Sequence, residues 1–113
     1  MAEQVMFHYT DEAGFKAISS QIAWTFLAGQ PPGGRPIGAY FTTKNPQFPR
    51  LFKLAIPRWK RAYVFAFADV SDLKGLSGGR GEYVFYSPTD YTVDVTRQRF
   101  CGRVELWKSA EPT

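Results

Sequence analysis

The chain has 113 residues, of which 44% are hydrophobic, and this is enough for one compact domain over residues 1–113. Lysine and arginine outnumber aspartate and glutamate by 14 to 10, which gives a net charge of +4. No apolar run approaches the roughly 20 residues that span a bilayer, and no signal-peptide pattern opens the sequence, so we expect no membrane contact and a cytoplasmic location.

The first half of the sequence predicts a strand, a helix and a second strand beside a loop. Val5 to Tyr9 is apolar and β-prone, and reads as the first strand. Thr10 is a suitable N-cap with acidic residues after it, so the helix should begin there and run to about Ser20. The rest of this half should form a short strand or irregular segment over 22–27, a Pro/Gly-rich loop over 29–36 and a strand over 37–42.

The second half is expected to consist mostly of strands. Residues 43–56 are interrupted by two prolines and then become compatible with a helix, which Pro57 ends. The strongest strand covers 62–70, where bulky aromatic residues alternate with smaller ones. A glycine-rich turn over 75–81 should lead to three further strands, over 82–86, 91–95 and 100–107. This order predicts an α+β fold with an antiparallel-rich sheet and one or two helices.

Positive charge is concentrated in the middle of the chain. No acidic residue occurs between Glu12 and Asp69. A field of one sign attracts polyanions such as a pyrophosphate or a nucleic-acid backbone. Aromatic residues are interleaved with the cations of this block, which is typical of surfaces that bind single-stranded nucleic acid. The cations that we expect to contact RNA are Arg50, Lys53, Arg58, Lys60 and Arg61.

Several familiar sites do not occur in the sequence. It contains neither the G-x-G-x-x-G dinucleotide fingerprint nor a phosphate loop. His8 is the single histidine and Cys101 the single cysteine, so a His-rich or multi-cysteine metal site and an internal disulfide are excluded. We therefore expect no metal. Because Cys101 lies in a strand-like segment, we expect a small buried thiol in a protein of a reducing compartment.

Three short motifs could carry chemistry: Phe7-His8-Tyr9-Thr10, Gly38-Ala39-Tyr40-Phe41-Thr42, and Gly81-Glu82-Tyr83-Val84-Phe85-Tyr86. Glu82 opens a strand that should be buried, where a carboxylate must be paired, hydrated or functional. Taken together and in this order, the motifs resemble the His-Tyr-Glu class of ADP-ribosyltransferases, that of diphtheria toxin and the poly(ADP-ribose) polymerases. The resemblance covers most of the chain and implies a small split-β-sheet domain of the kind found in polymorphic toxins.

The resemblance implies that His8, Tyr40 and Glu82 are catalytic residues that meet in one cleft, with NAD as the substrate. Glu82 would stabilise the ribosyl cation and hold a ribose hydroxyl, and Tyr40 would pack on nicotinamide. His8 would bond a ribose hydroxyl on the adenosine side. The backbone of Tyr9 would clamp the carboxamide, although better-known members carry glycine there. The other expected NAD contacts are Thr10, Phe41, Thr42 and Phe52, the last in place of a second stacking tyrosine, which is replaced by leucine at position 51.

The expected function is mono-ADP-ribosyl transfer from NAD to a macromolecular acceptor, RNA or protein. Arg80 precedes Glu82 by two residues, where the arginine-modifying class carries a second glutamate or glutamine, so that class is disfavoured. The resemblance also implies a toxin or effector delivered into a target-cell cytoplasm and countered by an immunity protein. Two alternatives stay open: an NAD glycohydrolase that uses water as the acceptor, and a non-enzymatic RNA-binding module that uses the basic aromatic block.

Overall fold

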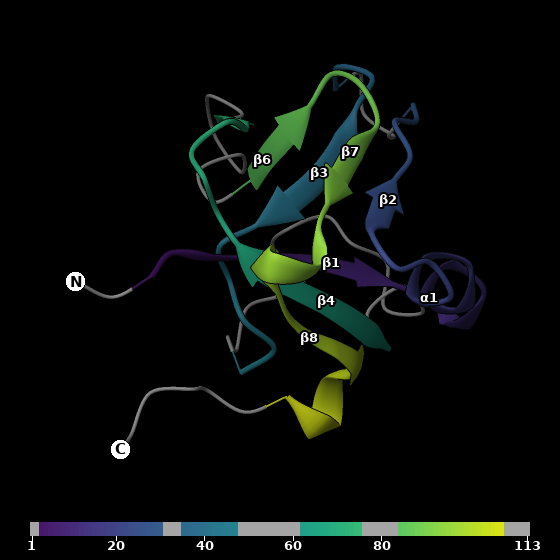
Figure 1. Ribbon diagram of the computed structural model, residues 1–113. Coiled ribbons are helices and arrows are strands. Elements are labelled where there is room, and N and C mark those ends of the chain that lie inside the picture. The colour runs from purple at the N-terminus through teal and green to yellow at the C-terminus, as the bar shows by residue number, and fades with distance from the viewer. Residues whose placement is uncertain (1–2, 31–34, 48–61, 76–83, 108–113) are drawn as a thin grey trace.

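The computed structural model describes residues 3–30, 35–47, 62–75 and 84–107, which Figure 1 shows in colour. The chain is an α+β protein with antiparallel sheets, as the sequence predicts. Its elements in order are β1 (Val5–Thr10), α1 (Glu12–Ser19), β2 (Trp24–Phe26), β3 (Ala39–Thr42), β4 (Tyr63–Ala68), β5 (Lys74–Gly75), β6 (Val84–Ser87), β7 (Tyr91–Val93), the 3-10 helix η4 (Val95–Arg97), β8 (Gln98–Arg103) and the 3-10 helix η5 (Val104–Leu106).

Six strands form one sheet in the order β5-β6-β3-β1-β4-β8, and β2 pairs with β7 in a second, two-stranded sheet. β1 pairs with β4 along its whole length, from Val5 opposite Ala68 to Thr10 opposite Tyr63. Its pairing with β3 is described at one position, where Phe7 faces Thr42. Figure 1 shows β3 and β6 diverging from β1 and β4 beyond this point. The large sheet therefore divides into two halves that meet between β1 and β3.

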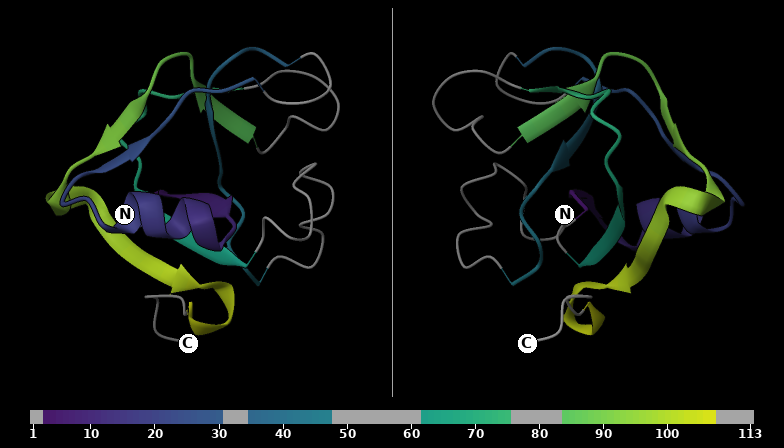
Figure 2. Two further views of the ribbon diagram at one scale, coloured as in Figure 1. Left: turned by 90° about the vertical axis from the view of Figure 1, so that its right-hand side faces the viewer. Right: turned by 60° about the vertical axis from the view of Figure 1, so that its left-hand side comes forward.

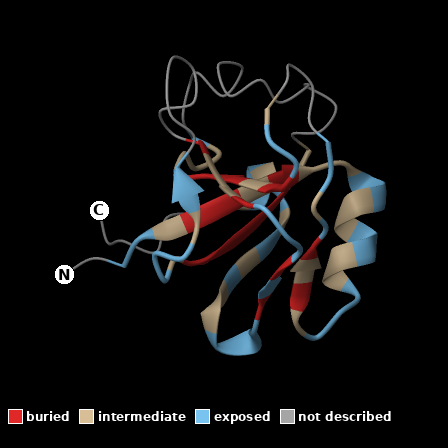
Figure 3. Cartoon of the chain, turned by 90° about the horizontal axis from the view of Figure 1, so that it is seen from above, coloured by how far each residue is buried: buried red, intermediate tan, exposed pale blue. Residues whose placement is uncertain are grey.

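Each face of the large sheet supports a separate core. The inner face, which carries Met6, His8 and Phe41, is covered by α1 and the β2–β7 pair, and Figure 2 shows the helix lying across this side. Figure 3 shows that burial is concentrated in the strands. The first core lies on the inner face and consists of Met6, Trp24, Phe26, Ala39, Phe41, Phe65, Phe67, Tyr91 and Val93; the second lies on the outer face and consists of Phe7, Tyr9, Val64 and Ala66.

Helix α1 begins one residue later than predicted. Asp11, not Thr10, is the N-cap, and its Oδ1 accepts a hydrogen bond from the backbone N–H of Gly14 at 2.8 Å. Thr10 is still extended and pairs with Tyr63 in the sheet. Its side chain fills the space beside Gly14, where an added Cβ would stand 2.0 Å from Thr10 Oγ1. The glycine that lowers helix propensity is therefore required by the close approach of strand and helix.

The prediction that Cys101 is buried is wrong, because its thiol is exposed. β8 is the last strand in the sheet order, and half-buried and exposed residues alternate along it. Phe100 packs toward the second core, so Cys101 projects from the other face. The strand predicted over 100–107 ends early, because the 3-10 helix η5 begins at Val104. Val104 and Trp107, the residue after η5, pack against the second core.

Some predictions fall outside the described residues. They are most of the segment over 43–56, with its helix-compatible part, most of the glycine-rich turn over 75–81, and the first residues of the strand over 82–86. Among the described helices, none has the length and apolar character needed to cross a membrane.

Candidate functional site

His8 is held in the inner face of β1 by both its ring and its Nδ1 atom. The imidazole lies 4.7 Å from the ring of Phe26 and 5.6 Å from that of Phe41, centroid to centroid. Nδ1 lies 2.9 Å from the carbonyl oxygen of Tyr40. A carbonyl oxygen accepts hydrogen bonds and cannot donate, so Nδ1 carries the proton in this arrangement.

The side chain of Tyr40 projects from the opposite face of the sheet. It follows Ala39 and precedes Phe41, both buried in the first core, and successive strand residues alternate between faces. Its hydroxyl donates to the carbonyl oxygen of Pro36. Partial burial raises the pKa of Tyr40 above its ordinary value, and the positive charge of Arg35 opposes this shift. The structure thus brings His8 to the backbone of Tyr40 and not to its ring.

Two other predicted contact residues lie on the outer face, where they serve packing and loop geometry. Tyr9 is 6% exposed in the second core, and its hydroxyl donates to the carbonyl oxygen of Lys44 at 2.8 Å. Burial raises the pKa of Tyr9 well above its ordinary range, so the phenol remains a neutral donor. Thr42 is 3% exposed, and its Oγ1 accepts from the backbone N–H of Lys44 at 3.1 Å. The two side chains together fix the chain as it leaves β3.

The remaining predicted contacts are divided between the inner face and undescribed segments. Phe41 is a core residue with 3% exposure, and Thr10 packs against Gly14. Glu82 and Phe52 lie outside the described residues, so their convergence with His8 and Tyr40 stays a prediction.

Tyr86 on β6 is a neighbour of Tyr40 that the sequence analysis did not single out. The two residues face each other in the β3–β6 register, and their rings stack with centroids 5.5 Å apart and planes 17° from parallel. Gly38 makes room for Tyr86, because an added Cβ at Gly38 would lie 3.0 Å from Tyr86 Cδ2 and 2.5 Å from the carbonyl oxygen of Ser87. Strand alternation in the third motif was the available signal, since Val84 and Tyr86 share one side of the strand.

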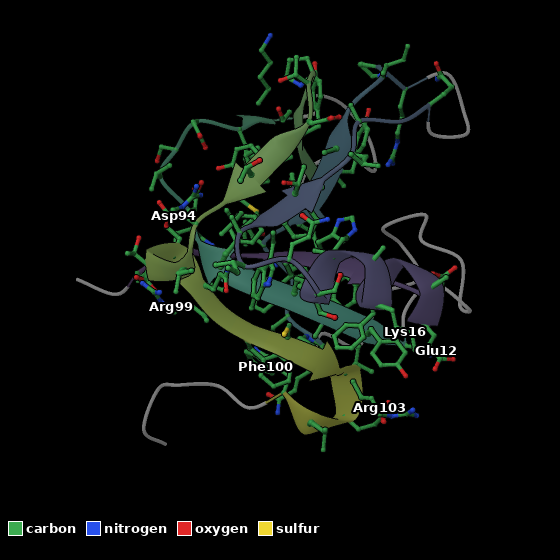
Figure 4. The ribbon with its side chains drawn as sticks, turned by 45° about the vertical axis from the view of Figure 1, so that its right-hand side comes forward. Glu12, Lys16, Asp94, Arg99, Phe100 and Arg103 are labelled. Atoms are coloured by element: carbon green, nitrogen blue, oxygen red, sulfur yellow. The ribbon has the colours of Figure 1, made fainter. Side chains whose placement is uncertain are left out.

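The cations predicted to contact RNA, Arg50, Lys53, Arg58, Lys60 and Arg61, lie outside the described residues. Within the described part, three other cations are paired with carboxylates: Lys16 with Glu12, Arg99 with Glu3, and Arg103 with Glu105. Figure 4 shows Glu12 and Lys16 on the exposed side of α1, and Arg99 and Arg103 at the two ends of β8. Among the described residues, no group of three His, Cys, Asp or Glu side chains is arranged to hold a metal ion.

Comparison of the chain with protein-family models, with curated protein sequences and with solved structures finds no match. A function must therefore be inferred from the residues and their arrangement.

Proposed function

We propose that this protein is a mono-ADP-ribosyltransferase with a split-sheet fold of the His-Tyr-Glu class, which cleaves NAD and transfers ADP-ribose to a macromolecular acceptor. The observation that carries the proposal is the strand order. His8 lies on β1, Tyr40 on β3, and Glu82 two residues before β6, and these strands are consecutive neighbours in the order β6-β3-β1. The motifs of His8 and Tyr40, and the described residues Val84–Tyr86 of the third motif, therefore lie on three adjacent strands.

The hydrogen bond between His8 and the Tyr40 carbonyl also supports the proposal. It joins the first two motifs at the place where β1 and β3 diverge. The imidazole and the phenol lie on opposite faces of the sheet, so their joint contact with one dinucleotide is itself part of the proposal.

The reaction breaks the bond between the nicotinamide nitrogen and C1′ of the ribose, and nicotinamide leaves with the bonding electrons. The transition state has the character of a ribosyl cation. The carboxylate of Glu82 stabilises this charge and accepts a hydrogen bond from a ribose hydroxyl. The acceptor nucleophile then forms a bond to C1′ and loses a proton, so NAD and the acceptor yield ADP-ribosyl acceptor, nicotinamide and a proton.

Tyr40 and His8 bind and orient the substrate in this scheme. The phenol ring of Tyr40 packs on nicotinamide, and Nε2 of His8 accepts from a hydroxyl of the adenosine ribose. Tyr9 contributes its backbone to the carboxamide, because its side chain is committed to the second core and to Lys44. A backbone contact of this kind is compatible with a tyrosine at the position where the better-known members of the class carry glycine.

The proposal is tested with NAD labelled in its adenylate phosphate and a whole-cell extract. Transfer predicts a labelled macromolecule, and digestion with protease or nuclease then identifies it as protein or nucleic acid. Fast release of nicotinamide without an acceptor would favour the glycohydrolase alternative. Binding of RNA without any nicotinamide release would instead favour the non-enzymatic module.

A further inference from the structure

Tyr40 and Tyr86 form a closed aromatic pair. Their centroids are 5.5 Å apart with planes 17° from parallel, which is an offset stack. A third ring between them would need the two phenols to stand about 7 Å apart, twice the contact distance of aromatic carbons. A planar ligand cannot enter this pair without separating it, so Tyr86 covers one side of the Tyr40 ring and the other side is the one left for a ligand.

The pair is held from several directions. Tyr40 donates its hydroxyl to Pro36, and the loop that contains Pro36 is closed by two hydrogen bonds of 3.0 Å between the backbones of Gly29 and Gly38. Tyr86 lies against the Cα of Gly38, where a side chain would contact both its ring and the β6 backbone. The plane of the Tyr40 ring is thus fixed by its hydroxyl at one end and by the Tyr86 ring on one side.

We propose that Tyr86 is a positioning residue for NAD: its ring backs the ring of Tyr40 and so presents the opposite side of Tyr40 to nicotinamide. This inference rests on the proposed function. Tyr86 acts through Tyr40 and does not itself sandwich the ligand, so the second stacking ring that the sequence analysis gave to Phe52 stays a prediction. Gly38 in the second motif then has a defined role, because only a residue without a side chain leaves room there for the ring of Tyr86.

The expected effect is on binding and not on the chemical step. The nicotinamide ring of NAD carries a positive charge before the bond breaks, and the face of a phenol ring attracts a cation. This attraction is strongest in the ground state, because nicotinamide loses its charge as the bond breaks, so its loss raises the dissociation constant and KM for NAD and does not lower kcat. A fixed Tyr40 ring also avoids the cost of ordering the side chain when NAD binds.

The test measures NAD binding by calorimetry and nicotinamide release by chromatography in the full chain and three variants. Tyr86→Leu removes the backing ring, and we expect the dissociation constant for NAD to rise about threefold to tenfold. Tyr86→Phe keeps the ring and should bind NAD as the wild type does. Phe85→Leu is the matched control, because Phe85 is the preceding residue of β6 but packs against the first core.

Two results overturn the inference in distinguishable ways. If the wild type binds NAD and Tyr86→Leu binds it equally well, Tyr86 has no positioning role and the proposed function stands. If the wild type neither binds NAD nor releases nicotinamide, both proposals fail. If Tyr86→Leu does not fold, an NMR titration of the wild type with NAD replaces it. The chemical shifts of the Tyr40 ring protons should then change more than those of Tyr91, which is buried in the first core. Equal or absent shifts contradict the inference.

Discussion

The imidazole of His8 donates a hydrogen bond of 2.9 Å to the backbone carbonyl of Tyr40, while the two side chains project from opposite faces of the sheet. The bond spans the junction of the two halves of the sheet, where one residue pair of the β1–β3 register is described. His8 therefore has two separable tasks in this account. Nδ1 helps to hold the junction together, and the proposed function gives the substrate contact to Nε2.

Two substitutions of His8 separate these tasks. His8→Leu leaves the Tyr40 carbonyl without this donor, so we expect the free energy of unfolding to fall by about 1–3 kcal/mol. His8→Asn places an amide nitrogen close to the position of Nδ1 and should retain most of the stability. Both variants lack Nε2, so both should bind NAD more weakly. Chemical denaturation and calorimetry are the measurements, and equal stability of the two variants would contradict the structural task of Nδ1.

Gly14→Ala should destabilise the protein although alanine favours helices. Alanine gains about 0.8–1 kcal/mol in helix propensity over glycine. However, its Cβ would stand 2.0 Å from Thr10 Oγ1, and Thr10 is a β-branched residue held in β1. We expect a net loss of about 1–3 kcal/mol, as for other overpacked sites.

A double-mutant cycle shows whether this clash is the cause. Thr10→Ala removes the hydroxyl that the added methyl group of Gly14→Ala would meet, so the double variant should recover most of the lost stability in urea denaturation. Strictly additive losses in the double variant would show that another contact is responsible.

Tyr91 should make the stability of the protein sensitive to alkaline pH. Its hydroxyl donates to Asp72 Oδ1 at 2.6 Å and accepts from Arg97 Nη2 at 2.7 Å. Burial, and then the bond to Asp72, raises the pKa of Tyr91 to about 12. A tyrosine in an unfolded chain titrates near about 10. Because the folded pKa is the higher one, the stabilising contribution is complete below a pH of about 10 and is lost as the pH rises toward about 12.

Tyr91→Phe removes this titration. The variant should be less stable at neutral pH, by about 1–2 kcal/mol, because Asp72 and Arg97 lose a common partner. It should also lose less stability than the wild type between about pH 9 and about pH 11. Denaturation curves at several pH values give this comparison directly, with Tyr9 unchanged in both proteins. Parallel losses in the two proteins would mean that Tyr91 does not contribute to the alkaline transition.

Local signals in the sequence predict the strands and the helix well, and fail where the fold depends on distant contacts. The apolar run before His8 and the acidic turn after Thr10 identify β1 and α1. The choice between Thr10 and Asp11 as the N-cap depended on the pairing of Thr10 with Tyr63, which is 53 residues away in the chain. The exposed position of Cys101 likewise follows from the place of β8 at the end of the sheet order, which no local pattern reveals.

The sequence predicts the strands that carry the motifs of His8 and Tyr40, but not the faces to which the two side chains project. These motifs lie on the neighbouring strands β1 and β3. Strand alternation and register place the two side chains on opposite faces of the sheet. A shift of β3 by one residue would move the side chain of Tyr40 to the face that carries His8. The stacking of Tyr40 on Tyr86 also needs the β3–β6 register, which no local pattern in the sequence reveals.

The most direct test of the proposed transferase activity is the rate of nicotinamide release from NAD by the wild type and by Glu82→Gln, which replaces the carboxylate with a neutral group of the same shape. Glu105→Gln is the control, because Glu105 is an exposed carboxylate paired with Arg103. The account predicts release by the wild type and the control, and a loss of at least about 100-fold in Glu82→Gln at unchanged thermal stability. Equal release by the wild type and Glu82→Gln, or no release by either, would contradict it.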